Sequence, residues 1–153
     1  LTYEMQDQVA KTRSFGFYAD MEEISLTIAD SRASDAVDAV MNTFYGRAPM
    51  HYATDLGHSL ETFQDNWLDA INHRTTVVIL GDGRNNYNSP RLDLIKDIQR
   101  RSRKLIWFNP ENPRQWGTGD SDMLEYAPLC DQVFMVRNLA QLSAAVDKMM
   151  AGA

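Results

Sequence analysis

The stretch from Thr76 to Leu80 constrains the fold more than any other part of the chain. Its five residues are β-branched or aliphatic, none is charged, and Gly81-Asp82-Gly83 follows directly. Uninterrupted apolar runs of this kind are typical of parallel strands that helices cover on both faces. A parallel strand needs a crossover to its neighbour, and the crossover is usually a helix. The stretch therefore predicts an α/β fold.

Helical periodicity on both sides of this strand supports the prediction. Apolar residues recur every three or four positions before the strand at Leu56, Leu60, Phe63, Trp67 and Ile71, and after it at Leu92, Ile95 and Ile98. Thr54 or Asp55 is expected to cap the first of these helices. Ser89-Pro90 is expected to start the second, because Ser suits the N-cap and Pro suits the first helical position.

Period-two segments near the amino end predict an antiparallel hairpin. Phe15 and Phe17 alternate with small or polar residues, and the alternation returns at Ile24, Leu26 and Ile28. We place the turn between the two strands at residues 20–22.

The other patterns complete an alternation of strands and helices. They predict a helix within residues 1–12, a helix with Val37, Val40, Met41 and Phe44 inward, strands at 105–108 and 132–136, a short helix within 120–127, and a helix after Asn138 with Leu139, Leu142, Val146 and Met149 inward. The order is α-β-β-α-α-β-α-β-α-β-α. It is typical of a three-layer, mostly parallel sheet with an antiparallel hairpin at its edge. At 153 residues, the chain is expected to form one domain over residues 1–153.

Composition excludes several classes of protein. The formal net charge is -6, from 15 Lys and Arg against 21 Asp and Glu, which disfavours a nucleic-acid binder. The sequence has no apolar run of the roughly 18 to 20 residues that a membrane span needs. Its single cysteine, Cys130, excludes a disulfide scaffold and a thiolate zinc cluster. We expect Cys130 to be a small buried residue in a reducing compartment.

The best candidate site follows the central apolar strand. In open α/β sheets, ligands bind outside the carboxyl ends of the strands. Asp82 leaves that strand between Gly81 and Gly83, with Asn85 close behind. The flanking glycines allow a sharp turn or a close approach by another group. The open alternative is a glycine-rich turn whose aspartate is simply solvated.

A second candidate lies at Thr54 and Asp55, just before a helix. The simple reading of this pair is a helix cap. A hydroxyl before a helix and an aspartate after a parallel strand can also converge at one edge of a sheet, where hard oxygen ligands suit Mg²⁺. Two protein oxygens are too few for a dedicated site. Asp120 and Asp122 are either part of the same edge or an acidic helix start.

Catalytic signatures are missing from the sequence. It contains no G-x-S-x-G nucleophile elbow, no P-loop and no H-E-x-x-H helix. His51, His58 and His73 show no diagnostic spacing to an acid–base partner.

Several segments carry a family resemblance. TTVVILGDGRNNY, KLIWFNPE, WGTGDSDMLEYAPLCD and VRNLAQL resemble the von Willebrand factor A (VWA) domains of CoxE-like bacterial proteins. RSFGFYADMEEIS and HYATDLGHSL resemble the hairpin and the Thr-bearing loop of the same domain. The resemblance covers nearly the whole chain and implies a Rossmann-like VWA fold.

The resemblance also implies a metal-ion-dependent adhesion site. That site uses an Asp-x-Ser-x-Ser motif after the first strand, a Thr in a later loop and an Asp after the fourth strand. Thr54 and Asp82 take the last two roles, with Mg²⁺ or another divalent cation as the metal. Asp-x-Ser-x-Ser does not occur in the sequence. We expect the motif and the central first strand ahead of residue 1; the alternative is a variant that lacks the metal.

The function that the resemblance implies is binding rather than catalysis. In this family an acidic side chain of a protein partner completes the metal's coordination. CoxE-like proteins are typically cytoplasmic adaptors that work with MoxR-type AAA+ ATPases in maturing or remodelling a target. Two alternatives stay open: a Mg²⁺-dependent phosphoester hydrolase using Asp82 and Asp55, and a metal-free interaction domain using the loop around Trp116.

Overall fold

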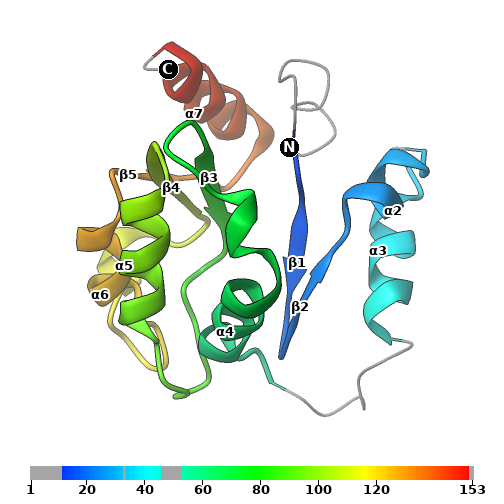
Figure 1. The fold of residues 1–153 in the computed structure, drawn as a ribbon. Coiled ribbons are helices and arrows are strands. Elements are labelled where there is room, and N and C mark those ends of the chain that lie inside the picture. Colours follow the sequence, from blue (N-terminus) through cyan, green and yellow to red (C-terminus); the bar gives the residue numbers. More distant parts are fainter. Residues whose placement is uncertain (1–11, 33, 46–52, 152–153) are drawn as a thin grey trace.

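The computed structural model describes residues 12–32, 34–45 and 53–151. Its elements are β1 (Phe15–Phe17), β2 (Met21–Glu23), α2 (Ser25–Ala29), α3 (Ala36–Tyr45), α4 (Leu56–Trp67), the 3-10 turn η1 (Leu68–Ala70), β3 (Thr76–Leu80), α5 (Leu92–Arg101), β4 (Lys104–Asn109), η2 (Pro113–Gln115), α6 (Met123–Tyr126), η3 (Ala127–Leu129), β5 (Gln132–Met135) and α7 (Leu139–Ala151). This is the α/β fold that the sequence predicts (Figure 1). Of the helix predicted within residues 1–12, only residue 12 is described.

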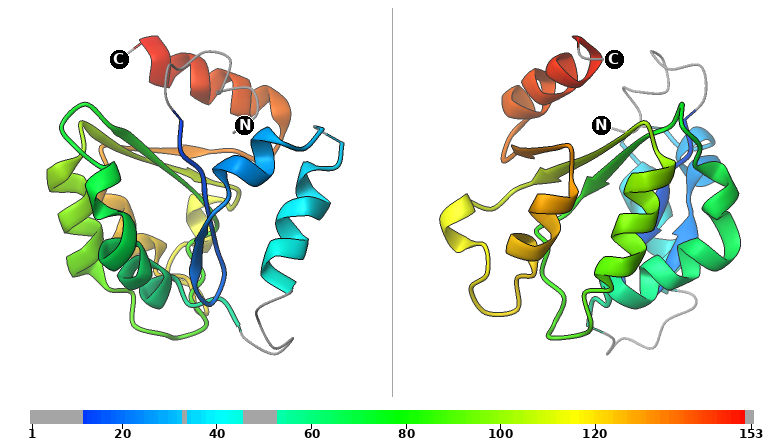
Figure 2. Two further views of the ribbon diagram at one scale, coloured as in Figure 1. Left: turned by 45° about the vertical axis from the view of Figure 1, so that its right-hand side comes forward. Right: turned by 60° about the vertical axis from the view of Figure 1, so that its left-hand side comes forward.

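A parallel sheet of β3, β4 and β5 forms the centre, with β4 in the middle. Thr76 pairs with Lys104 at one end of the β3–β4 ladder, and Leu80 pairs with Phe108 at the other. Every residue of β4 from Leu105 onward is buried. The reason is that α7 covers one face of the sheet, while α4, α5 and α6 cover the other (Figure 1, Figure 2).

The larger core lies between the sheet and α4, α5 and α6. Ile95, Leu105 and Trp107 have no exposed surface there. The Trp107 ring stacks on Tyr126 of α6 at 5.1 Å between centroids, and the Tyr126 hydroxyl donates to the Pro90 carbonyl at 2.9 Å. These contacts fix α6 and the start of α5 beneath the carboxyl ends of the strands.

The predicted hairpin is present, but its second strand is not where the alternation placed it. β1 pairs with β2 in antiparallel register, with Phe15 opposite Glu23. The turn lies at residues 18–20 rather than 20–22, since β2 already begins at Met21. The alternating segment forms the short helix α2 instead, because Ile24 and Ile28 lie one helical turn apart and are both buried, while Leu26 is 78% exposed.

β1 and β3 belong to separate sheets, and each has one edge without a strand partner among the described residues. Their carboxyl ends nevertheless approach each other, because a Cβ added at Gly81 would lie 3.3 Å from the Phe17 ring. The hairpin itself lies between α4 and α3 (Figure 1, Figure 2). A central strand with the Asp-x-Ser-x-Ser motif, expected ahead of residue 1, stays a prediction.

Several helical details differ from the sequence patterns. Val37 and Met41 of α3 are 69% and 41% exposed, and Leu139 of α7 is 82% exposed, so none of the three is buried in the core. α5 begins at Leu92 rather than at Pro90, because Arg91 adopts a left-handed conformation with φ 45° before it.

Cys130 is half-buried among core residues, and burial raises the pKa of its thiol to about 12.

Candidate functional site

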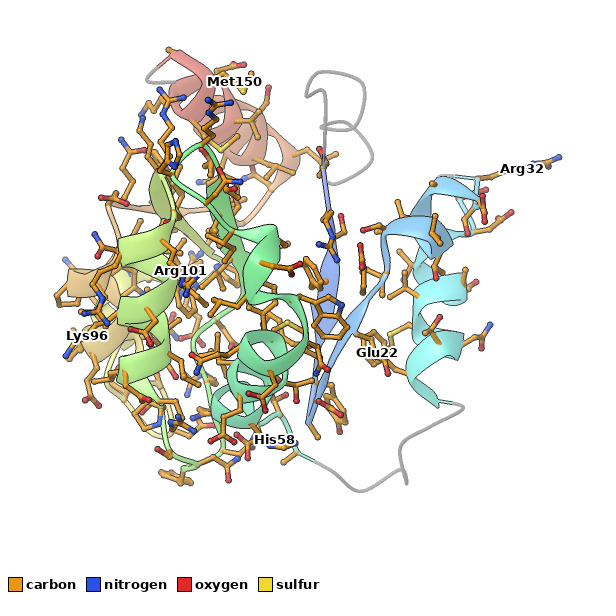
Figure 3. All side chains as sticks on the ribbon, viewed as in Figure 1. Glu22, Arg32, His58, Lys96, Arg101 and Met150 are labelled. Atoms are coloured by element: carbon orange, nitrogen blue, oxygen red, sulfur yellow. The ribbon has the colours of Figure 1, made fainter. Side chains whose placement is uncertain are left out.

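The two predicted ligand loops meet at one edge of the molecule. Thr54 precedes α4, and Asp82 follows β3. The side-chain amides of Asn86 and Asn88 both donate to the Thr54 carbonyl, at 2.9 and 3.3 Å. The loop after β3 therefore holds the loop before α4 directly. In Figure 3, His58 marks this end of α4.

Asp55 is the residue that caps α4. Its Oδ1 accepts the His58 N–H at 2.9 Å, and its own N–H donates to the Tyr18 carbonyl at 2.9 Å. The sequence left Thr54 and Asp55 as alternative caps, and the structure assigns this task to Asp55. The Thr54 hydroxyl makes no hydrogen bond to any described residue.

Asp82 is fixed through its backbone and one carboxylate oxygen. Its carbonyl accepts the Asn109 side-chain amide at 2.9 Å, and its Oδ1 accepts the Arg84 N–H at 3.0 Å. Within the described parts of the chain, its Oδ2 has no hydrogen-bond partner. One oxygen therefore orients the carboxylate while the other is available.

The two glycines around Asp82 have different tasks. Gly83 has φ 76°, a conformation that favours glycine, and a Cβ there would be a tight fit at 3.1 Å from Met123 Sδ. The Gly81 N–H donates to the Phe108 carbonyl at 3.1 Å, and the Trp107 indole donates to the Gly81 carbonyl at 2.8 Å. Both glycines fix the backbone around Asp82, whichever ligand it takes.

Asn85 is fully buried and acts as the internal brace of the loop. Its Oδ1 accepts the Leu56 N–H of α4 at 2.8 Å. Its Nδ2 lies 3.1 Å from the Asn88 carbonyl and 3.2 Å from the Ser89 carbonyl. Asn85, predicted as a residue at the rim or behind it, lies behind the loop and holds its shape.

Arg84 binds two acids at this edge and was not found by sequence reasoning. Its Nε and Nη2 donate to Glu111 at 2.8 and 3.1 Å. Its Nη1 donates to Asp120 Oδ1 at 2.8 Å. We call Glu111, Arg84 and Asp120 the rim triad. Asp120 thus belongs to the rim rather than to a helix start.

The rim triad also connects to Thr54. Asp120 Oδ2 accepts the Asn86 N–H at 3.1 Å, and the Asn86 side chain reaches Thr54 as described. The hydrogen bonds that Arg84 donates to Glu111 and Asp120 raise the pKa of its guanidinium, and Arg84 in turn lowers the pKa of Asp120. The triad is therefore a set of charges that stabilise one another.

Asp122 differs from its neighbour Asp120. Its Oδ2 is buried without a hydrogen-bond partner, and its side chain does not cap α6. Burial raises the pKa of Asp122, and the charges of Glu125 and Asp120 raise it further, against a lowering by Asn85. Burial therefore disfavours the charged form of this carboxyl group relative to an exposed aspartate.

The donor set suits a divalent cation in kind, though not in number. A Thr hydroxyl and an Asp carboxylate are hard oxygen ligands of the type that Mg²⁺ prefers, and Mg²⁺ takes six. Among the described residues, no three His, Cys, Asp or Glu side chains form a metal-binding group. Thr54 and Asp82 therefore fit part of a Mg²⁺ site.

The two alternative functions, a phosphoester hydrolase and a metal-free interaction domain, have less support from this geometry. A hydrolase needs further available acids, yet the nearby Glu111 and Asp120 are both paired with Arg84. Trp116 packs against the core, and its indole nitrogen is buried, so it does not present a prominent contact surface. His51 lies outside the described residues.

The comparison with known families decides the membership of the chain. Residues 1–145 match the family described as VWA domain containing CoxE-like protein. The chain belongs to this CoxE-like VWA family. No curated protein and no solved structure matches it. In this VWA domain the loops that carry Thr54 and Asp82 are joined through Asn86 and Asn88. Among the described helices, none is long and apolar enough to cross a membrane.

Proposed function

We propose that this VWA domain is a protein-binding module whose rim holds a divalent cation, Mg²⁺ being the first candidate. The observation that carries the proposal is the direct link between the Thr54 and Asp82 loops through Asn86 and Asn88. Family membership supports a protein-binding role.

Thr54 and Asp82 are the described residues that would hold the cation, through a hydroxyl and a carboxylate oxygen that no other described group uses. A bound Mg²⁺ supplies a hard Lewis acid to which a carboxylate of a partner can attach. Asn109 and Arg84 orient Asp82 for this task, while Asn86 and Asn88 set the position of Thr54. Other ligands come from groups that the described residues do not include.

We further propose that the partner is a MoxR-type AAA+ ATPase or the target that it remodels, and that the two meet in the cytoplasm. The acidic residue that completes the site would come from that partner. The resemblance to CoxE-like proteins supports this assignment.

Binding to a purified MoxR-type ATPase, measured by biolayer interferometry with Mg²⁺ and with EDTA, tests the proposal. We expect binding that EDTA abolishes and that added Mg²⁺ restores. The substitution Asp82→Ala should abolish binding, whereas Asp65→Ala should not, because Asp65 is exposed on α4 away from the loop after β3. Binding that EDTA does not weaken would instead favour the metal-free interaction domain.

A further inference from the structure

A permanently charged side chain follows the proposed metal ligand closely in the sequence. Arg84 is only two residues after Asp82, and its backbone N–H already bonds to that carboxylate at 3.0 Å. A guanidinium is always charged and forms strong pairs with carboxylates. Unless something else engages it, this arginine is a natural competitor of any cation at Asp82.

Four side-chain hydrogen bonds direct the Arg84 guanidinium elsewhere. Glu111 takes two of them in a bidentate pair. Nη1 lies 2.8 Å from Asp120 Oδ1 and 3.3 Å from the Thr118 carbonyl. An arginine side chain has five N–H donors, so these contacts use most of its capacity.

These contacts are partly protected from solvent. Side-chain exposure is 29% for Arg84, 19% for Glu111 and 21% for Asp120. Glu111 is itself fixed, because its N–H donates to the side chain of the fully buried Asn109 at 2.7 Å. Asp120 is fixed by the Asn86 N–H. The two acids are therefore rigidly placed acceptors for the guanidinium.

We propose that Glu111 and Asp120 are positioning residues that hold the Arg84 guanidinium away from Asp82 and so keep Asp82 available to a divalent cation. The inference rests on the proposed function, since it concerns the same carboxylate. It assigns the two acids a task other than metal ligation.

Mg²⁺ titrations of four full-length proteins by isothermal calorimetry test the inference. The proteins are the wild type, R84Q, the double variant E111Q/D120N and the triple variant R84Q/E111Q/D120N. The double variant removes both anionic partners of the guanidinium and leaves ionised Asp82 as the preferred one, so its Mg²⁺ affinity should fall about tenfold, the effect of one charge within about 4 to 6 Å. The triple variant should regain the wild-type affinity, and R84Q should bind at least as tightly as the wild type.

Rescue distinguishes this role from a merely structural one. The triple variant has lost every ion pair of the triad, so simple loss of structure would leave it as weak as the double variant. Asp93→Asn is the matched control, because Asp93 pairs with Arg91 in the next stretch of the chain at 2.9 Å, and it should not change Mg²⁺ affinity. If the double variant does not fold, E111Q and R84Q/E111Q provide the corresponding comparison, because Glu111 accepts two of the four hydrogen bonds of the guanidinium.

The outcomes are separable. A double variant that binds Mg²⁺ like the wild type, or a triple variant that is no better than the double one, overturns the inference and leaves the proposed function standing. A wild-type protein that binds no Mg²⁺ overturns the proposed function, and the inference falls with it.

Discussion

The side-chain oxygen of Asn85 accepts a hydrogen bond from the backbone N–H of Leu56 at 2.8 Å. The first N–H groups of a helix have no partner within it, and here a fully buried amide from the loop after β3 satisfies one of them. This bond joins the Asp82 loop to the start of α4, where the Thr54 loop ends. It makes the geometry of the site depend on a residue that contacts neither proposed ligand.

Replacing Asn85 with alanine should lower the free energy of unfolding by about 1 to 3 kcal/mol, because the buried Leu56 N–H loses its acceptor. Urea unfolding followed by circular dichroism measures this change. Asn66→Ala is the control, since Asn66 is exposed and bonds only within α4; its effect should stay within about 0.5 kcal/mol. Equal effects of the two substitutions would contradict the bracing role of Asn85.

Replacing Tyr87 with glycine should stabilise the protein. The tyrosine has φ 60° and is 83% exposed. Its left-handed backbone is therefore strained, and its side chain contributes little packing energy in return. Because that conformation costs an L-residue roughly 1 to 2 kcal/mol, Tyr87→Gly should raise the free energy of unfolding by about 1 kcal/mol. Tyr18→Gly is the comparison: Tyr18 is not among the residues with positive φ, and its replacement should destabilise the protein. A loss of stability in Tyr87→Gly would show that the ring makes an important contact.

Gly57 should not tolerate alanine, although alanine usually stabilises a helix. A Cβ at this position would lie 2.1 Å from the Ser89 carbonyl oxygen. Separating α4 from the loop to relieve this overlap should cost about 1 to 3 kcal/mol, and the melting temperature should fall. Asp65→Ala, on the exposed side of the same helix, should leave it nearly unchanged. A Gly57→Ala protein as stable as the wild type would mean that this contact is loose.

Asp122 should weaken the fold as the pH rises. Because its pKa is raised from the ordinary 3.8, the folded protein favours the neutral acid. Its stabilising contribution is fully present below that ordinary value and is lost as the pH rises through the folded pKa. Asp122→Asn should therefore be more stable than the wild type at pH 7, and the difference should disappear near pH 3.

Urea unfolding between pH 3 and pH 7 measures both sides of this comparison. Asp120→Asn should show the opposite sign, because Arg84 lowers the pKa of Asp120. The contribution of Asp120 is present above its ordinary pKa and is lost as the pH falls through the folded value. Asp122→Asn that is less stable than the wild type at pH 7 would contradict the burial argument.

Local sequence patterns predicted the helices and strands whose formation depends mainly on neighbouring residues. The expected strand at Thr76–Leu80 has the bounds of β3, because a short run of β-branched and aliphatic residues before a glycine-rich turn favours a strand. The expected cover on both faces is incomplete, since both ends of β3 are exposed. The Thr54 loop and the loop after β3 are joined through Asn86 and Asn88, and their proximity was expected because ligand sites lie at the carboxyl ends of strands. These features need only nearby residues and the order of the elements.

The rim triad could not be read from the sequence in the same way. Arg84 lies 27 residues from Glu111 and 36 from Asp120, and ion pairs across such separations leave no periodic trace. The second strand of the hairpin was placed wrongly for a related reason: Met21-Glu22-Glu23 has little strand character of its own, and its pairing with β1 decides its structure. Contacts between distant parts of the chain determine both the ion pairs of the rim triad and the position of β2.

Mg²⁺ titration of the wild type and of Asp82→Ala by isothermal calorimetry tests the central claim most directly. The account predicts that the wild type binds Mg²⁺ and that Asp82→Ala weakens binding by more than about tenfold, while Asp65→Ala does not. Equal Mg²⁺ affinity in the wild type and in Asp82→Ala, or no binding by the wild type, would contradict it.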